Sequence, residues 1–176
     1  MQMQDPPRWF LSVIALAFFF GVAAAPSTAQ EKIKVAGKLT AAATESYSMT
    51  VGDTEGHTFL MSKSEGVNTS TGKNTFMDGA LVVNHNGADL IKGNGPHQGY
   101  IILSKDGGSG VAHWKGKVTT TMSPGNIPMT TMEGTYTYTK GTGQFENIQG
   151  GGTYKGRYIS EKTYVVEWEG EYSIKK

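Results

Sequence analysis

The chain has 176 residues, no cysteine and a formal net charge of +1, with 16 Lys and Arg residues against 15 Asp and Glu. The lack of thiols excludes disulfides, a thiolate metal site and a cysteine-linked lipid anchor. The balanced, scattered charge argues against a nucleic-acid partner and against strong adhesion to anionic membranes. The 24 glycines, together with threonines in many strand-like positions, indicate an all-β protein.

Residues 1–29 have the pattern of an export signal. A polar start with one cation precedes an apolar run over residues 9–25, and small residues continue to Ala29. We predict cleavage after Ala29, with Ala25 as the second choice. An uncleaved membrane anchor is the alternative, because the run approaches the roughly 20 residues that span a bilayer. The expectation is an exported protein, periplasmic or secreted, with a single domain over 30–176 and no stable membrane anchor after cleavage.

Short β-prone stretches follow one another through the rest of the chain, and no useful helical period occurs after Ala29. We expect a long loop or bulged crossing at 84–98, a further loop at 65–73 and a hairpin turn at 106–108. About nine strands are predicted, at 32–39, 47–51, 58–62, 100–105, 109–122, 129–140, 144–148, 152–159 and 163–174, and residues 76–83 are apolar enough for a strand buried on both faces.

Glycines inside the later strands favour a closed sheet. Gly116, Gly134, Gly152 and Gly170 each fall on the apolar face of a stretch that alternates with period two. A mid-strand glycine costs stability, so four in one register suggest bends around a common axis. Closure also removes the exposed edges of an antiparallel meander. We predict a closed or nearly closed antiparallel β-barrel of about 8–9 strands, with a two-sheet sandwich as the alternative.

The segment 141–154 carries a family resemblance. Gly141-Thr142-Gly143-Gln144-Phe145, followed by Ile148, Gly150, Gly152, Thr153 and Tyr154, resembles the signature of allene oxide cyclase-like barrels. Plant dirigent proteins and small exported bacterial proteins of unassigned role carry similar segments. The resemblance covers some thirty residues clearly and implies a β-barrel of eight or so strands, a ligand or substrate in its mouth, and a homo-oligomer, a dimer or trimer. No catalytic residue is carried over from the family.

Aromatic residues on the predicted inner faces form the first candidate site. Such residues can line a cavity for an apolar or ring-containing ligand, and core packing explains them equally well. A glycine-rich stretch at 93–100 can place polar groups at the rim, or form a plain turn. The candidate wall is Trp114, Tyr136, Tyr138 and Trp168, with Tyr164 nearby, and the candidate rim is Asn94, His97 and Gln98.

Two further groups of residues, the histidines and a row of glutamates, could form a metal-binding or catalytic site, but ordinary surface positions explain them better. The histidines His57, His85, His97 and His113 lack compact metal-binding spacing, so neither a metal site nor a cofactor is predicted, and His97 is the one catalytic candidate, as a general base. The carboxylates Glu167, Glu169 and Glu171 recur at period two, which is typical of a solvated exterior face opposite lysines.

The sequence therefore predicts an exported β-barrel that holds a small apolar or aromatic molecule. One alternative is a cyclase or isomerase of the allene oxide cyclase-like type. Another is a structural envelope protein with a filled core and no cavity.

Overall fold

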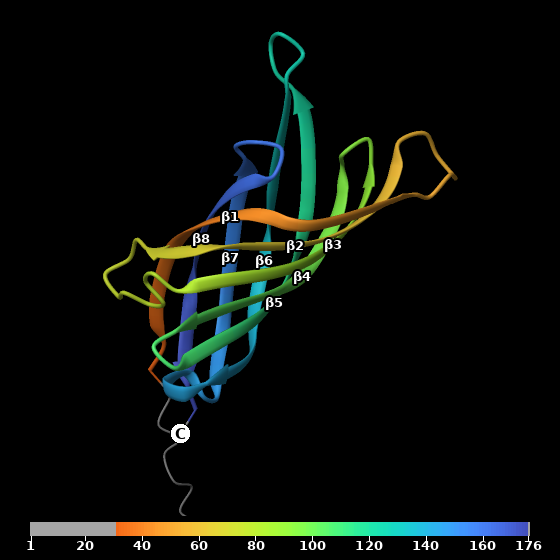
Figure 1. Cartoon of the computed structure of the whole chain (residues 1–176). Coiled ribbons are helices and arrows are strands. Elements are labelled where there is room, and N and C mark those ends of the chain that lie inside the picture. Colours follow the sequence, from red (N-terminus) through yellow and green to blue (C-terminus); the bar gives the residue numbers. More distant parts are fainter. Residues whose placement is uncertain (1–30, 176) are drawn as a thin grey trace, which may run out of the picture.

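The computed structural model describes residues 31–175, which form a closed antiparallel β-barrel (Figure 1). Each strand pairs with the next along the chain, and β8 closes the sheet against β1. This confirms the predicted barrel and excludes the sandwich. The strands are β1 (Ile33–Thr50), β2 (His57–Ser70), β3 (Leu81–Ile91), β4 (Gly95–Lys105), β5 (Gly108–Met122), β6 (Pro128–Thr142), β7 (Ile148–Tyr158) and β8 (Thr163–Ile174).

The predicted signal segment and its cleavage site lie outside the described residues. Within residues 31–175, no helix is both long and apolar enough to cross a membrane.

Several predicted boundaries were wrong. The strands predicted separately at 32–39 and 47–51 are one continuous strand, β1. Gly143–Phe145 forms a 3-10 turn, and β7 runs without interruption from Ile148 through the break predicted before residue 152. Since β3 is an additional strand, the barrel has eight strands in all. The expected loop at 65–73 is wrong up to Ser70, which ends β2. Residues 76–80 belong to a loop, and β3 begins only at Leu81.

The expected irregular crossing at 84–98 is instead a regular hairpin of β3 and β4. Ile91 and Asn94 bridge across a tight turn, in which Lys92 has φ 51° and Gly93 has φ 76°. Positive φ at both central residues is the geometry that suits a two-residue hairpin loop. Pro96 is tolerated near the start of β4, where its pairing is with β5 and the pairing with β3 has not yet begun.

Alternation along the strands separates the lumen from the exterior. The carboxylates of β8 lie on the outer face, as predicted: Glu167 is opposite Lys38 of β1 and Lys155 of β7, and Glu171 forms an ion pair with Lys32.

The end of the barrel near the chain's C-terminus is plugged from within. The β2–β3 loop turns inward, and Phe76, Met77 and Ala80 are buried. The Phe76 ring packs against the aromatic rings of Tyr138 and Phe145, at centroid distances of 5.9 and 5.4 Å. At the opposite end, the β1–β2 and β5–β6 hairpins project beyond the barrel wall (Figure 1). The loop therefore closes one end of the lumen, and the hairpins surround the other end.

Candidate functional site

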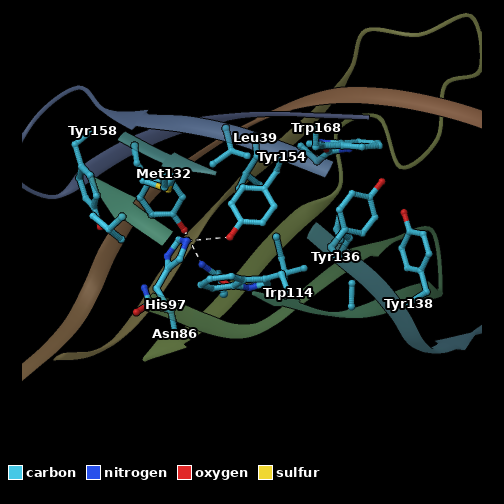
Figure 2. Close-up of a pocket in the computed structure, with 18 of the residues that line it drawn as sticks. Leu39, Asn86, His97, Trp114, Met132, Tyr136, Tyr138, Tyr154, Tyr158 and Trp168 are labelled. Atoms are coloured by element: carbon cyan, nitrogen blue, oxygen red, sulfur yellow. Dashed lines mark hydrogen bonds between the residues drawn. The ribbon is translucent and has the colours of Figure 1, made fainter. Parts of the chain in front are cut away.

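A cavity of about 100 Å³ lies inside the barrel, between the plug and the hairpin end. Four of the predicted wall residues line it, from strands β5, β6 and β8, and Tyr164 of β8 joins them. The four are Trp114, Tyr136, Tyr138 and Trp168 (Figure 2). The structure thus brings together side chains up to 54 residues apart in the chain, from Trp114 to Trp168, because alternate positions on each strand face the lumen.

Of the three predicted rim residues, only one lines the cavity. His97 is 8% exposed and lines the cavity. Gln98 is its neighbour on β4 and lies exposed on the outer face. Asn94 sits in the β3–β4 turn, where its amide donates to Lys92 O and accepts from Thr120 N–H. Neither Asn94 nor Gln98 lines the cavity, because the stretch is a hairpin and its side chains alternate between faces.

Both indoles are fixed by buried asparagines. Trp114 Nε1 donates to Asn84 Oδ1 over 2.9 Å, and the Asn84 amide donates in turn to the Tyr164 hydroxyl over 2.9 Å. Trp168 Nε1 donates to Asn68 Oδ1, also over 2.9 Å. Buried polar groups that find partners hold side chains in one arrangement. The aromatic wall is therefore preformed.

The two indoles pack closely against the backbone of glycines, which have no side chain to block them. A β-carbon added to Gly37 would lie 2.3 Å from the Trp168 indole, and one added to Gly99 would lie 2.6 Å from the Trp114 indole. Each indole thus lies directly over a glycine of another strand. These two glycines are not among the four predicted to bend the strands, and they leave space for the wall.

His97 and Tyr154 form a polar pair near the hairpin end of the cavity (Figure 2). The Tyr154 hydroxyl and His97 Nε2 are 2.9 Å apart, and the imidazole packs edge-on against Trp114 at a centroid distance of 4.8 Å. Burial lowers the pKa of His97 to about 4 and raises the pKa of Tyr154 above its usual range. Both groups are consequently neutral at physiological pH.

Two lining residues keep a buried oxygen free. Asn86 donates to Ser62 Oγ over 2.8 Å, and its Oδ1 has no hydrogen-bond partner among the described residues. The Tyr136 hydroxyl also has none of acceptable geometry, although Tyr138 lies beside it. Burial raises the pKa of Tyr136 to about 12, so this hydroxyl stays protonated and can donate or accept. An unpaired buried polar group is costly and marks a place where a ligand or water can bind.

The remaining histidines do not converge on the lumen. His57 lies at the start of β2 between the carboxylates of Asp53 and Asp89. His85 and His113 flank Tyr100 in the strand register and lie on the exterior. Within residues 31–175, no group of three or more His, Asp or Glu side chains is placed to hold a metal ion.

Sequence reasoning missed several lining residues. Tyr154 and Tyr158 of β7 line the cavity and have no predicted role, although they alternate toward the lumen with Gly152 and Gly156. The polar lining, Asn68, Asn84 and Asn86, was assigned to loops. The available signal was the alternation of small and amide side chains at positions 84, 86 and 88.

No protein-family model matches this chain, and no curated protein sequence matches it significantly. The resemblance to allene oxide cyclase-like barrels therefore stays a prediction.

Proposed function

We propose that this protein is an exported β-barrel that holds a small, largely apolar, ring-containing molecule in its lumen. The observation that carries the proposal is the cavity, because it is lined by preformed aromatic side chains and keeps two buried oxygens free. Mostly apolar lining with a few fixed polar groups is typical of small-molecule sites. Export rests on the sequence of residues 1–29.

The size of the cavity sets the size of the ligand. An engineered protein cavity of about 150 Å³ with apolar lining binds benzene. At about 100 Å³ the cavity of this barrel is smaller, so the ligand is at most a single ring or a short chain, with any substituent directed toward the hairpin end. A solid-core envelope protein would have no such space, which favours the binding function over that alternative.

The free oxygens give the ligand a polar group. A hydroxyl both donates and accepts, so it can pair either with the Tyr136 hydroxyl or with the free end of the Asn86 amide, whichever way that amide is oriented. A phenol or a comparable ring alcohol therefore fits better than a pure hydrocarbon. Allene oxide cyclase-like membership remains part of this proposal and adds no residue role to it.

The cyclase or isomerase alternative depends on the His97–Tyr154 pair, which lies inside the cavity. A histidine with a pKa of about 4 is a weak general base at neutral pH, because the best catalytic base titrates near the working pH. This favours binding over proton-transfer catalysis. The two functions differ in one observable, a product of altered connectivity after incubation with the bound molecule.

The test uses protein of residues 30–176, with phenol and toluene as probes. The chain has three tryptophans, and the two within this segment, Trp114 and Trp168, both line the cavity. Intrinsic tryptophan fluorescence therefore reports on the lumen. Saturable change with both probes, and tighter binding of phenol, is the expected result. Unchanged fluorescence together with no heat in titration calorimetry would refute the proposal.

Matched variants locate the probe. Tyr136→Phe and Asn86→Leu, each tested alone, remove one free oxygen. In one of them phenol binding should weaken by about three- to tenfold, as expected for a hydrogen bond worth roughly 0.5–1.5 kcal/mol, while toluene binding holds. Tyr100→Phe, on the exterior, is the control. Alanine at Trp114 and Trp168, in protein that stays folded, should weaken uptake of both probes, and unchanged uptake would remove the wall assignment.

A further inference from the structure

One stretch of the barrel wall has a neighbour on one side only. β1 pairs with β2 up to Thr50↔Thr58, whereas its pairing with β8 ends at Ala42↔Thr163. The Ala43 N–H still donates to Lys162 O. Beyond it, residues 44–50 form an edge strand with no partner among residues 31–175 on the β8 side, and they belong to the hairpin that projects from the barrel (Figure 1).

The direction of the free backbone groups follows from the β1–β2 ladder. The Val51 N–H donates to His57 O, so Val51 faces β2. In an antiparallel ladder, successive residues point their N–H and C=O groups to opposite sides. The groups of Ser46, Ser48 and Thr50 therefore face away from β2, in the direction in which Ala43 bonds to β8. They form a ready row of donors and acceptors.

Apart from a register shift between Ala43 and Glu45 at its start, this edge lacks the features that normally protect an edge strand. Residues 44–50 contain no lysine, proline or glycine, and Glu45 is their single charge. On the outer face, Tyr47 is 69% and Met49 is 61% exposed, and they lie opposite Met61 and Phe59 of β2. An exposed apolar face beside an unpaired edge is a template for another strand.

We propose that residues 44–50 pair antiparallel with the same segment of a second copy, about a two-fold axis at Tyr47. This register uses the whole free segment. It places Ser46 opposite Ser48, so that these two edge-facing residues exchange hydrogen bonds, and it places Glu45 opposite Met49, so that no like charges meet. The segment is thus self-complementary, which is what a two-fold interface requires. The two barrels then share one continuous sheet.

The mass of the protein in solution tests the pairing. Protein of residues 30–176 is measured by light scattering after size-exclusion chromatography over a concentration series, and a dimer at the higher concentrations is expected. Ser48→Pro removes an N–H that faces the partner and leaves the β1–β2 ladder intact, so it should give a monomer. Ser48→Ala keeps the N–H and should remain a dimer. Circular dichroism and the fluorescence of the two lumen tryptophans verify that each variant is folded.

Cross-linking tests the register. The chain has no cysteine, so Tyr47→Cys introduces one thiol per copy. Residues facing each other in a non-hydrogen-bonded antiparallel pair have Cα atoms about 4.5 Å apart, within the range of a disulfide. Mild oxidation should give a covalent dimer much faster than it does for the exterior control Tyr100→Cys. The proposal would be overturned by a monomeric wild type or by a dimer that survives Ser48→Pro. Equal cross-linking rates for the two cysteine variants, or an unrelated peptide bound at the edge, would also overturn it.

Discussion

Replacing His97 by glutamine is expected to flatten the acid side of the stability profile. The imidazole is 8% exposed and pairs with Tyr154, and its burial lowers the pKa to about 4, against 6.5 for an unperturbed histidine. Between these two pH values the unfolded chain binds a proton that the folded barrel excludes. The contribution of His97 to the free energy of unfolding is therefore fully present above pH 6.5 and is lost as the pH falls from there through about 4.

The size of the effect follows from the two pKa values. Each tenfold change in proton affinity is worth about 1.4 kcal/mol, so His97 accounts for a loss of roughly 3 kcal/mol between pH 6.5 and pH 4. Below pH 4 its contribution is constant. The carboxylates add their own acid dependence, but they are the same in the wild type and in His97→Gln, and the difference between the two profiles isolates the imidazole.

Urea unfolding at a series of pH values, followed by tryptophan fluorescence, measures this difference. The free energy of unfolding of the wild type should fall faster than that of His97→Gln, whatever the offset between them at pH 7. An NMR titration of the His97 ring gives its folded-state pKa directly. Parallel profiles, or a ring that titrates near 6.5, would show that the imidazole is solvated and that the lumen description is wrong.

Three further predictions concern packing, a buried hydrogen bond and the hairpin tip. Gly37→Ala forces a β-carbon to within 2.3 Å of an indole and 2.8 Å of a backbone carbonyl, and should cost at least 1–3 kcal/mol, on the order expected for overpacking. Gly87→Ala, whose nearest atom is 3.9 Å away, should not destabilise, and urea midpoints compare the two. Trp114→Phe leaves a buried amide acceptor without its donor and should cost about 1–3 kcal/mol, with an unchanged m-value. The hydrogen bond to Asp89 raises the pKa of His57, and the one to Asp53 raises it less. The stabilisation from the Asp89 contact is therefore complete below pH 6.5 and is lost as the pH rises through the raised pKa. In Asp89→Asn the NMR pKa of His57 should fall.

Period-two alternation accounts for the parts of the fold that the sequence predicts well. The stretches at 109–122, 129–140 and 163–174 match β5, β6 and β8 closely because large apolar side chains alternate there with charged or hydroxyl ones. The aromatic wall comes from these strands, so most of its members could be named in advance.

Polar residues that face inward defeat the same reasoning. Asn84 and Asn68 look like loop residues locally, yet each is buried because an indole 30 or 100 residues away donates to it. The Phe76 loop is similar, since its apolar residues resemble a strand and in fact plug the lumen. Such pairings depend on barrel closure, and no local window of sequence contains them.

The plugged end has a kinetic consequence. Because Phe76 closes one end of the lumen, a molecule bound there as proposed would enter and leave at the hairpin end. Any loop or side chain that narrows this entrance slows binding and release by the same factor. It changes how long a guest resides without changing the occupancy reached at equilibrium.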